Sequence, residues 1–236
     1  MSSPSASHTP TGAFEFDALN HATRYQAALV KEFSPHLRGN FLEVGSGLGQ
    51  MTRWFSAQGL THFLALEPDG SFCRRFHADL PRRWIVQGTV KAVAPESAWD
   101  TIWSVNVLEH IQDDRGELVA YAKLLAKNHG SLCLFVPARP EIYAPIDRDF
   151  GHYRRYTRKE LRGKLQDAGF QIVRLNYFNF VGYFGWWLNF RVLRQRRFAT
   201  SSVKLFDRFI FPWAHAVESC CVRPPWGQSL LAVARA

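Results

Sequence analysis

The stretch FLEVGSGLGQ, residues 41–50, places three glycines at alternate positions directly after a run typical of a buried strand. Glycine is used in this way where the backbone turns tightly or approaches a ligand closely. A strand that runs through such a loop into a helix predicts a nucleotide site, with open backbone amides and a positive helix end facing the ligand. The stretch therefore predicts one strand–loop–helix unit of an α/β fold.

Strand-like and helix-like runs alternate through most of the chain, which is the pattern of a parallel sheet with helices on both faces. Strands are predicted over residues 40–45, 61–67, 83–88, 99–106, 130–137, 171–178 and 229–236. Helices are predicted over residues 17–33, 48–57, 69–78, 112–127 and 157–169. The last helix begins with the pattern of a capping box, Thr157 followed by Glu160. A chain of 236 residues with 47% hydrophobic residues suits one such domain.

Three segments do not follow this alternation. Residues 1–12 are small, polar and contain proline, so we expect a disordered tail before a domain over residues 13–236. Residues 138–156 form a loop that is too long for an ordinary connection, which indicates a functional segment. Residues 178–228, the C-terminal insertion, have helical patterns rich in aromatic and basic residues. We expect this insertion to cover the substrate as a helical lid.

The net charge of +9 favours an anionic partner, such as a phosphorylated or carboxylated substrate, an acidic membrane surface or nucleic acid. Charge alone does not choose among these. The four cysteines form no metal-binding or disulfide pattern, so we expect a reducing, cytoplasmic setting. The apolar run of the insertion is interrupted by Asn179 and Asn189 and is too short to span a bilayer. Its aromatic and basic residues instead suit peripheral contact with a membrane or a lipid-like substrate.

Glu43 separates two classes of nucleotide ligand. A dinucleotide site with the pattern GxGxxG needs a glycine at position 50, where this chain has Gln50. Glu43 lies two residues before Gly45, at the carboxyl end of the strand. Its carboxylate would repel a pyrophosphate and attract an ammonium or sulfonium group. The loop therefore favours a cationic ligand.

The pattern ExGxGxG after a hydrophobic strand resembles motif I of the class I S-adenosylmethionine-dependent methyltransferases. Glu67 ends the next strand, where this family places the acidic residue that binds the ribose hydroxyls. Residues 99–111, WDTIWSVNVLEHI, are similar to the family's fourth-strand motif, and GSLCLFVP resembles its fifth strand. The resemblance covers about residues 20–175 and the final strand. The most similar subgroup comprises small-molecule enzymes such as the O-methyltransferases of ubiquinone biosynthesis.

The resemblance implies a Rossmann-like, doubly wound sheet of seven strands with the last strand antiparallel. It implies S-adenosylmethionine as the cofactor and direct displacement of its methyl group by a nucleophile on a small molecule. The implied cofactor-binding residues are Glu43, Gly45, Ser46, Gly47, Gly49, Glu67, Pro68, Gly88, Thr89, Val90, Asn106 and Val107. The family often has Asp after the glycine that ends the third strand, and here the Thr89 hydroxyl or the backbone would contact the adenine.

Candidate residues for the acceptor follow the fourth and fifth strands. His110 is a candidate general base or a loop-stabilising residue, and His152 is a second candidate base. Candidate substrate contacts are Tyr153, Arg154, Arg155, Tyr156, Phe180, Phe184 and Trp187. The two arginines would hold a phosphate or carboxylate, or else form a solvated face. The aromatic residues would line an apolar pocket, or else pack the insertion onto the domain. No repeated ligand spacing indicates a metal.

Two other functions remain open from the sequence. A nucleic-acid methyltransferase is favoured by the positive charge. However, enzymes that methylate base amino groups carry an (Asp/Asn)-Pro-Pro-aromatic motif where this chain has SVNVLEH, residues 104–110. The other alternative is a non-catalytic binding module that keeps the cofactor fold for regulation or as a protein partner. The small-molecule enzyme is the leading interpretation.

Overall fold

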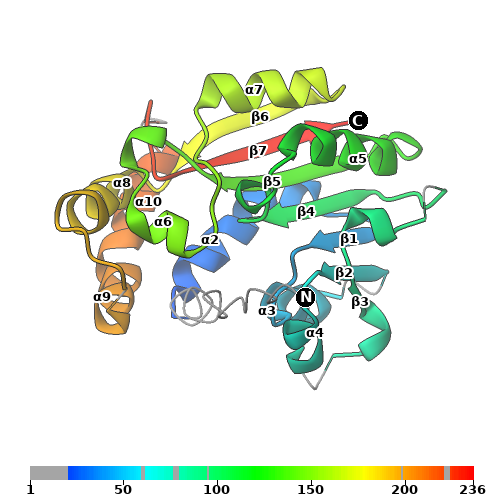
Figure 1. Cartoon of the computed structure of the whole chain (residues 1–236), viewed down its shortest axis with the longest axis horizontal. Coiled ribbons are helices and arrows are strands. Elements are labelled where there is room, and N and C mark those ends of the chain that lie inside the picture. Colours follow the sequence, from blue (N-terminus) through cyan, green and yellow to red (C-terminus); the bar gives the residue numbers. More distant parts are fainter. Residues whose placement is uncertain (1–20, 60–61, 77–79, 95, 198, 221–223) are drawn as a thin grey trace, which may run out of the picture.

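A seven-stranded sheet runs through the computed structural model of the chain (Figure 1). Its strands are β1 (Phe41–Val44), β2 (Phe63–Glu67), β3 (Ile85–Gln87), β4 (Thr101–Val105), β5 (Ser131–Pro137), β6 (Gln171–Phe178) and β7 (Ser229–Arg235). Their order is β3-β2-β1-β4-β5-β7-β6. The pairs among β1 to β5 are parallel, and β7 is antiparallel to β5 and β6. This topology confirms the predicted Rossmann-like sheet with an antiparallel last strand.

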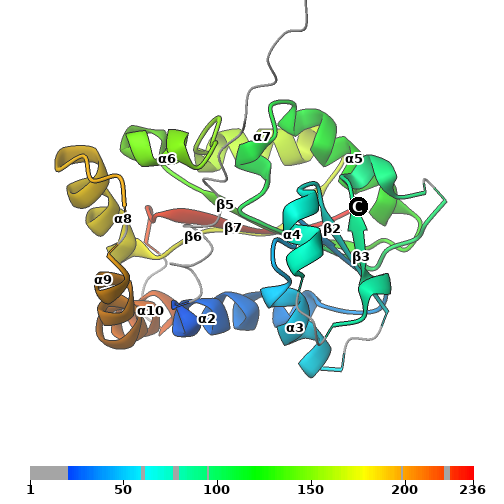
Figure 2. The same ribbon diagram turned by 60° about the horizontal axis from the view of Figure 1, so that its bottom comes forward.

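Helices cover both faces of the sheet, as Figure 2 shows. The helices are α2 (Thr23–Phe33), α3 (Gln50–Ala57), α4 (Gly70–Arg75), α5 (Asp114–Ala126), α6 (Pro145–Asp149), α7 (Arg158–Asp167), α8 (Phe180–Trp186), α9 (Thr200–Leu205) and α10 (Phe211–Cys220). One apolar cluster joins the sheet to α5 and α7, and a second joins it to α2, α3 and α10. Ile102 and Trp103 are adjacent in β4 but belong to opposite clusters, because successive side chains of a strand point to opposite faces.

The structure describes residues 21–59, 62–76, 80–94, 96–197, 199–220 and 224–236. The predicted tail at residues 1–12 and the start of the first predicted helix lie outside this part of the chain. The expected loop at residues 138–156 contains a short helix, α6, which the sequence pattern does not predict. Its first turn begins with Pro145, and the Asp147 carboxylate accepts a hydrogen bond from Ala144 N at 2.8 Å. Thr157 caps α7 as predicted, with its hydroxyl accepting from Glu160 N at 3.1 Å.

The C-terminal insertion is helical, as expected, and lies between β6 and β7 at one end of the sheet (Figure 1). α8 continues into the π-helical segment η6 (Trp187–Val192), and α9 continues through the π-helical segment η7 (Phe206–Ile210) into α10. None of the described helices combines the length and the apolar character needed to cross a bilayer.

The sheet has a switch point between β1 and β4. The chain runs outward from β1 through β2 to β3 and then crosses back to place β4 on the other side of β1. Ligands of open α/β sheets bind in the crevice beyond the carboxyl ends of the strands at such a point. The loops after β1, β2 and β4 meet there, and they carry the residues predicted to bind the cofactor.

Candidate active site

The glycine loop after β1 requires its glycines for backbone geometry and packing. Gly45, Gly47 and Gly49 have φ angles of 74°, 55° and 79°, which side-chain-bearing residues rarely adopt. A Cβ atom on Gly45 would lie 2.4 Å from Val107 Cγ2. A Cβ atom on Gly49 would lie 2.6 Å from the Phe76 ring. The loop therefore packs directly against the turn after β4 and the segment after α4.

The amides of this loop are engaged within the protein, contrary to the expectation that they are open. The donor–acceptor pairs are Gly45 N and Ser46 N to Leu66 O (2.9 and 3.0 Å), Gly47 N to Glu67 Oε2 (2.8 Å) and Gly49 N to Ser46 O (2.9 Å). A pyrophosphate site depends on free amides that point at the phosphate oxygens. This loop gives a ligand close access to the backbone, but these four amides are not available as donors to an anion.

Two buried carboxylates flank the loop. Glu43, at the end of β1, is 3% exposed and accepts a hydrogen bond from the Thr52 hydroxyl at 2.5 Å. Burial raises the pKa of Glu43 to about 8. Glu67 accepts from Gly47 N and, at 2.9 Å, from Asp69 N, and burial raises its pKa as well. A positive ligand at the loop would stabilise the charged form of both carboxylates.

Polar capacity at the loop fits a ligand that carries hydroxyl groups. The Ser46 Oγ is buried and has no hydrogen-bond partner in the part of the chain that the structure describes. Each Glu67 oxygen accepts one backbone amide and keeps a further lone pair. Asn106, directly after β4, is held at φ 54°, a strained conformation that is frequent at functional sites. The surroundings therefore match an adenosyl group with a positive charge.

The remaining predicted cofactor residues lie at the ends of β2 and β3. Gly88 N donates to Glu67 O at 3.0 Å, which keeps the two strand ends together. Thr89 is exposed, and its hydroxyl accepts a long hydrogen bond of 3.4 Å from Lys91 N. Val90 packs in the core, so its side chain does not face a ligand. Only its backbone could contact the cofactor.

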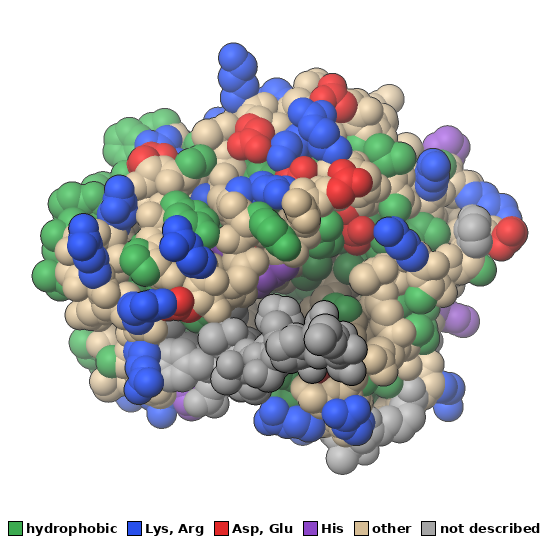
Figure 3. All heavy atoms as spheres, in the orientation of Figure 1, with side chains coloured by type: hydrophobic (Ala, Val, Ile, Leu, Met, Phe, Trp, Pro, Cys, Tyr) green, Lys and Arg blue, Asp and Glu red, His purple; other side chains and the backbone are tan. Residues whose placement is uncertain are grey.

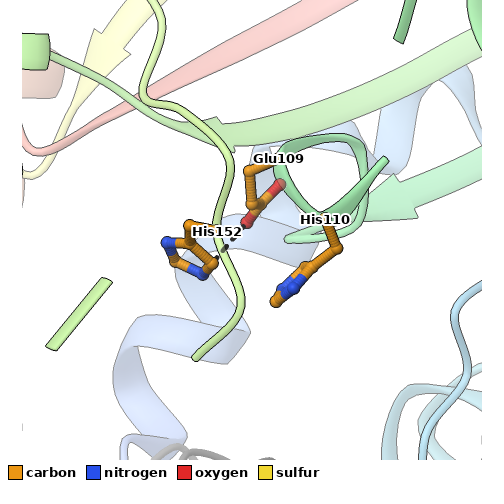
Figure 4. Close-up of side chains that lie close together, drawn as sticks. All are labelled: Glu109, His110 and His152. Carbon is orange, nitrogen blue, oxygen red and sulfur yellow. Dashed lines mark ion pairs between the residues drawn. The ribbon is translucent and has the colours of Figure 1, made fainter. Parts of the chain in front are cut away.

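A cluster of Glu109, His110 and His152 lies beyond the carboxyl end of β4. Glu109 and His110 belong to the short helix η4 (Leu108–His110), and His152 follows α6 (Figure 4). Tyr153 N donates to Glu109 O at 2.8 Å and so joins the two segments. His152 Nε2 lies 4.0 Å from Glu109 Oε1. The ring centroids of His110 and His152 lie 4.7 Å apart, with the rings edge to face.

Asp147 fixes the orientation of His152. The Asp147 Oδ1 lies 3.1 Å from His152 Nδ1, so Nδ1 carries the proton and the basic nitrogen Nε2 faces Glu109. His110 differs, because burial and the neighbouring His152 lower its pKa to about 4. His110 is therefore neutral at physiological pH and a weak base. Of the two predicted bases, His152 is the one whose ring is oriented by a carboxylate, and its Nε2 is buried beside Glu109. Its role as the base stays a prediction.

The same cluster offers ligand atoms for a divalent cation. One atom from each of Glu109, His110 and His152 lies within 4.8 Å of the other two. Imidazole and carboxylate groups are common ligands of zinc and other transition metals. The sequence has no repeated ligand spacing and so does not predict a metal. The three residues come from two segments about forty positions apart, which a search for local spacing does not reveal.

The predicted anion site at Arg154 and Arg155 is wrong, because both guanidinium groups are bound within the protein. Arg155 is buried, donates from Nε to Asp147 at 2.8 Å, and lies over the Trp186 ring at 4.3 Å. Arg154 pairs with Asp114 at 2.8 Å and donates to two backbone carbonyls. Tyr156 is also unsuited to substrate contact, since it is fully buried and its hydroxyl donates to Asp114 at 2.9 Å. Tyr153 is 57% exposed and keeps its predicted role as a proposal.

The aromatic residues of the insertion divide between core and surface. Trp186 and Phe190 are buried against α6 and the residues before it. Phe184 and Trp187 are 47% and 46% exposed, and Phe180 is partly buried. The prediction that Phe184 and Trp187 line an apolar substrate pocket stays a prediction. They face outward, while their neighbours anchor the insertion.

Comparisons with known proteins agree with this geometry. The profile of a family described as a methyltransferase domain matches residues 19–175. An S-adenosylmethionine-dependent methyltransferase from Mesorhizobium loti is 16% identical, with a TM-score of 0.58 over 89% of this chain and 98% of that one. One from Archaeoglobus fulgidus is 14% identical, with a TM-score of 0.60 over 95% and 99%. A comparison with curated proteins finds no match. The chain therefore belongs to the methyltransferase-domain family and has the Rossmann-like fold of the class I enzymes that use S-adenosylmethionine.

Proposed function

We propose that this methyltransferase transfers the methyl group of S-adenosylmethionine directly to a nucleophilic atom of a small, amphipathic or anionic molecule. The observation that carries the proposal is the pair of buried carboxylates, Glu43 and Glu67, beside a glycine loop whose amides are engaged. This arrangement suits a cation and disfavours the pyrophosphate of a dinucleotide. It lies at the switch point of the sheet, where α/β enzymes bind their ligands.

Each group would have a separate role. Glu67 and Ser46 would hold the ribose hydroxyls, and Glu43 would balance the positive charge of the cofactor. The cofactor supplies an already activated methyl group, so the protein mainly aligns the acceptor and excludes water. Such alignment is worth about 7–11 kcal/mol when the geometry is right. His152, held by Asp147, would take the proton of a weakly acidic acceptor.

The acceptor is proposed to be small because the glycine loop is hydrogen-bonded within the protein and because Glu109 and His152 are buried. The arginines proposed for an anionic head group are occupied, so this part of the proposal rests on the basic and apolar insertion. Incubation of the protein with labelled cofactor and lysate fractions tests it, with the added methyl group detected by mass spectrometry. Label incorporated into bulk RNA or DNA would instead identify a nucleic-acid methyltransferase. If calorimetry detected no binding of S-adenosylmethionine, the non-catalytic binding module would be favoured instead.

Glu43→Gln should weaken cofactor binding by about 10- to 100-fold, the usual range for a lost hydrogen bond to a charged group. The effect should depend on pH, because the pKa of Glu43 in the protein without cofactor is about 8. Below this pH the side chain is protonated and resembles Gln, and above it the carboxylate attracts the cation. The ratio of wild-type to variant affinity should therefore grow as the pH rises toward 8 and level off above it. Isothermal titration calorimetry at a series of pH values measures it.

The same variant has a second expected result without cofactor. The folded-state pKa of Glu43 lies above its ordinary value of 4.5, so the unfolded chain releases this proton first as the pH rises. The free energy of unfolding of the wild type should therefore fall as the pH rises from 4.5 to about 8. That of Glu43→Gln should fall less over the same range. Thr52→Val, which removes the hydroxyl that donates to Glu43, should raise the pKa of Glu43 further. A constant affinity ratio from acid to alkaline pH would contradict a charged role for Glu43.

A further inference from the structure

Exposed apolar side chains are concentrated on the C-terminal insertion. Ten of the fourteen large hydrophobic residues that are exposed in the described chain lie between Phe184 and Val217, so the distribution is not random. They are Phe184, Trp187, Leu188, Val192, Leu193, Leu205, Phe209, Ile210, Trp213 and Val217. Trp213 is 77% exposed and Val217 is 60% exposed. Scattered surface hydrophobics need no explanation, but a set of this size on one segment does.

Each helical run of the insertion is apolar on two faces. In α8 and η6, Trp186 and Phe190 pack inward, while Phe184, Leu188 and Val192 repeat every four residues on the outside. A surface helix normally has one apolar stripe, which faces the core, and a polar outer face. The outer stripe here contributes nothing to the core of the chain.

The second helical run repeats this arrangement. Phe211 is 2% exposed and packs in the core, whereas Phe209, Trp213 and Val217 follow one another at intervals of four residues toward solvent. α8 contacts α10, and both lie at the same end of the molecule (Figures 1 and 2). The two outer stripes therefore belong to the same end of the protein.

The charge of this end is positive. The basic side chains of the two runs and their connection, Arg191, Arg194, Arg196, Arg197, Lys204 and Arg208, are all exposed, and of these Arg196 pairs with Asp149 of α6. The acidic residues between Phe180 and Ser219 are Asp207 and Glu218. Asp207 is buried and accepts hydrogen bonds from Arg24 N and Tyr25 N, and Glu218 accepts from Asn179 N and Phe180 N. In Figure 3, hydrophobic side chains gather over this end with Lys and Arg side chains among them.

We propose that these outer stripes and basic side chains form a membrane-docking surface that binds the interface of an anionic lipid bilayer. Aromatic and aliphatic side chains enter the boundary between head groups and acyl chains, and Lys and Arg attract the anionic head groups. A second copy of the chain fits less well, because a twofold contact would place like charges against one another. The apolar side chains also project from helices rather than line a groove, which suits a broad, deformable partner.

Membrane docking does not depend on the proposed methyl transfer, but it would affect how the acceptor reaches the site. The insertion packs on α6, and His152 of the cluster with Glu109 and His110 follows α6. A docked molecule would hold its site close to the bilayer. An amphipathic acceptor could then reach the site from the lipid without crossing bulk water.

The test is co-sedimentation of the full chain with vesicles of phosphatidylcholine alone or mixed with phosphatidylglycerol. Binding is expected with the anionic vesicles, falling as salt is raised. The double variant Trp213→Ser/Val217→Ser removes two stripe residues, and Arg191→Glu/Arg194→Glu reverses two basic ones. Each should lower the partition coefficient by about tenfold or more. Far-UV circular dichroism and thermal unfolding verify that these exposed substitutions leave the fold intact.

Matched controls come from outside the insertion. Val119→Ser/Val173→Ser changes two exposed apolar residues outside the insertion, and Arg158→Glu/Arg162→Glu reverses two exposed charges of α7. Both should bind vesicles like the wild type. Absence of binding, or equal losses in the controls, would overturn the proposal. The proposal would also be overturned if the wild type bound no vesicles and formed dimers in light scattering that Trp213→Ser/Val217→Ser converts to monomers. Because binding needs no turnover, these outcomes are separate from failure of the methyl-transfer proposal.

Discussion

Replacing His152 with Asn should lower kcat by about 10²- to 10⁴-fold, the usual contribution of a general base. Asn keeps a side-chain N–H that can donate to Asp147, but it lacks the basic nitrogen that His152 directs toward Glu109. The affinity for S-adenosylmethionine should not change, because His152 follows α6 and lies outside the glycine loop. Single-turnover kinetics under saturating cofactor separate the chemical step from binding.

His110→Asn is the matched control for this prediction. The low pKa of His110, about 4, makes it a poor base at neutral pH, so its replacement should cost less than about tenfold. Removal of divalent metals by EDTA should leave wild-type kcat unchanged. If EDTA abolished turnover and zinc or manganese restored it, His152 would act as a ligand in the cluster with Glu109 and His110. If His152→Asn retained wild-type kcat without metal, neither role would stand.

The sheet and the glycine loop could be predicted from the sequence because their signals are local. Phe41–Val44 followed by three glycines specifies a buried strand and a turn, and the residues alone set both. β6 was predicted with its observed bounds, Gln171–Phe178, since polar residues and glycine delimit it. The position of Glu43 beside the glycine loop follows from the sequence for the same reason, because it lies two residues before Gly45.

The partners of charged side chains could not be predicted from the sequence, because they are set by residues distant along the chain. Arg154 and Arg155 look like an exposed basic pair, but Asp114 lies forty positions before Arg154 and neutralises it. The interior position of Arg155 depends on α6, which brings Asp147 beside it. The engaged amides of the glycine loop depend likewise on Leu66 and Glu67, which belong to the neighbouring strand.

The second large effect is expected on stability, from Asp147→Ala. Asp147 is fully buried and accepts hydrogen bonds from Ala144 N, from His152 and from the Arg155 guanidinium. Burial alone would raise the pKa of Asp147, but the hydrogen bond with His152 and the charge of Arg155 hold it below its ordinary value. Its stabilising contribution is therefore complete above the ordinary carboxyl pKa and is lost as the pH falls through the lowered value.

Removal of this carboxylate leaves the Arg155 charge buried without its partner, which typically costs about 3–5 kcal/mol. Urea denaturation at neutral pH should show this loss for Asp147→Ala and a similar one for Arg155→Ala. Asp149→Ala is the matched control in the same helix, because Asp149 pairs with Arg196, whose side chain is 63% exposed. It should change the free energy of unfolding far less. The double variant Asp147→Leu/Arg155→Leu should be more stable than either single variant, since it leaves no unpaired buried charge. Equal losses for Asp147→Ala and Asp149→Ala would show that burial does not set the strength of this pair.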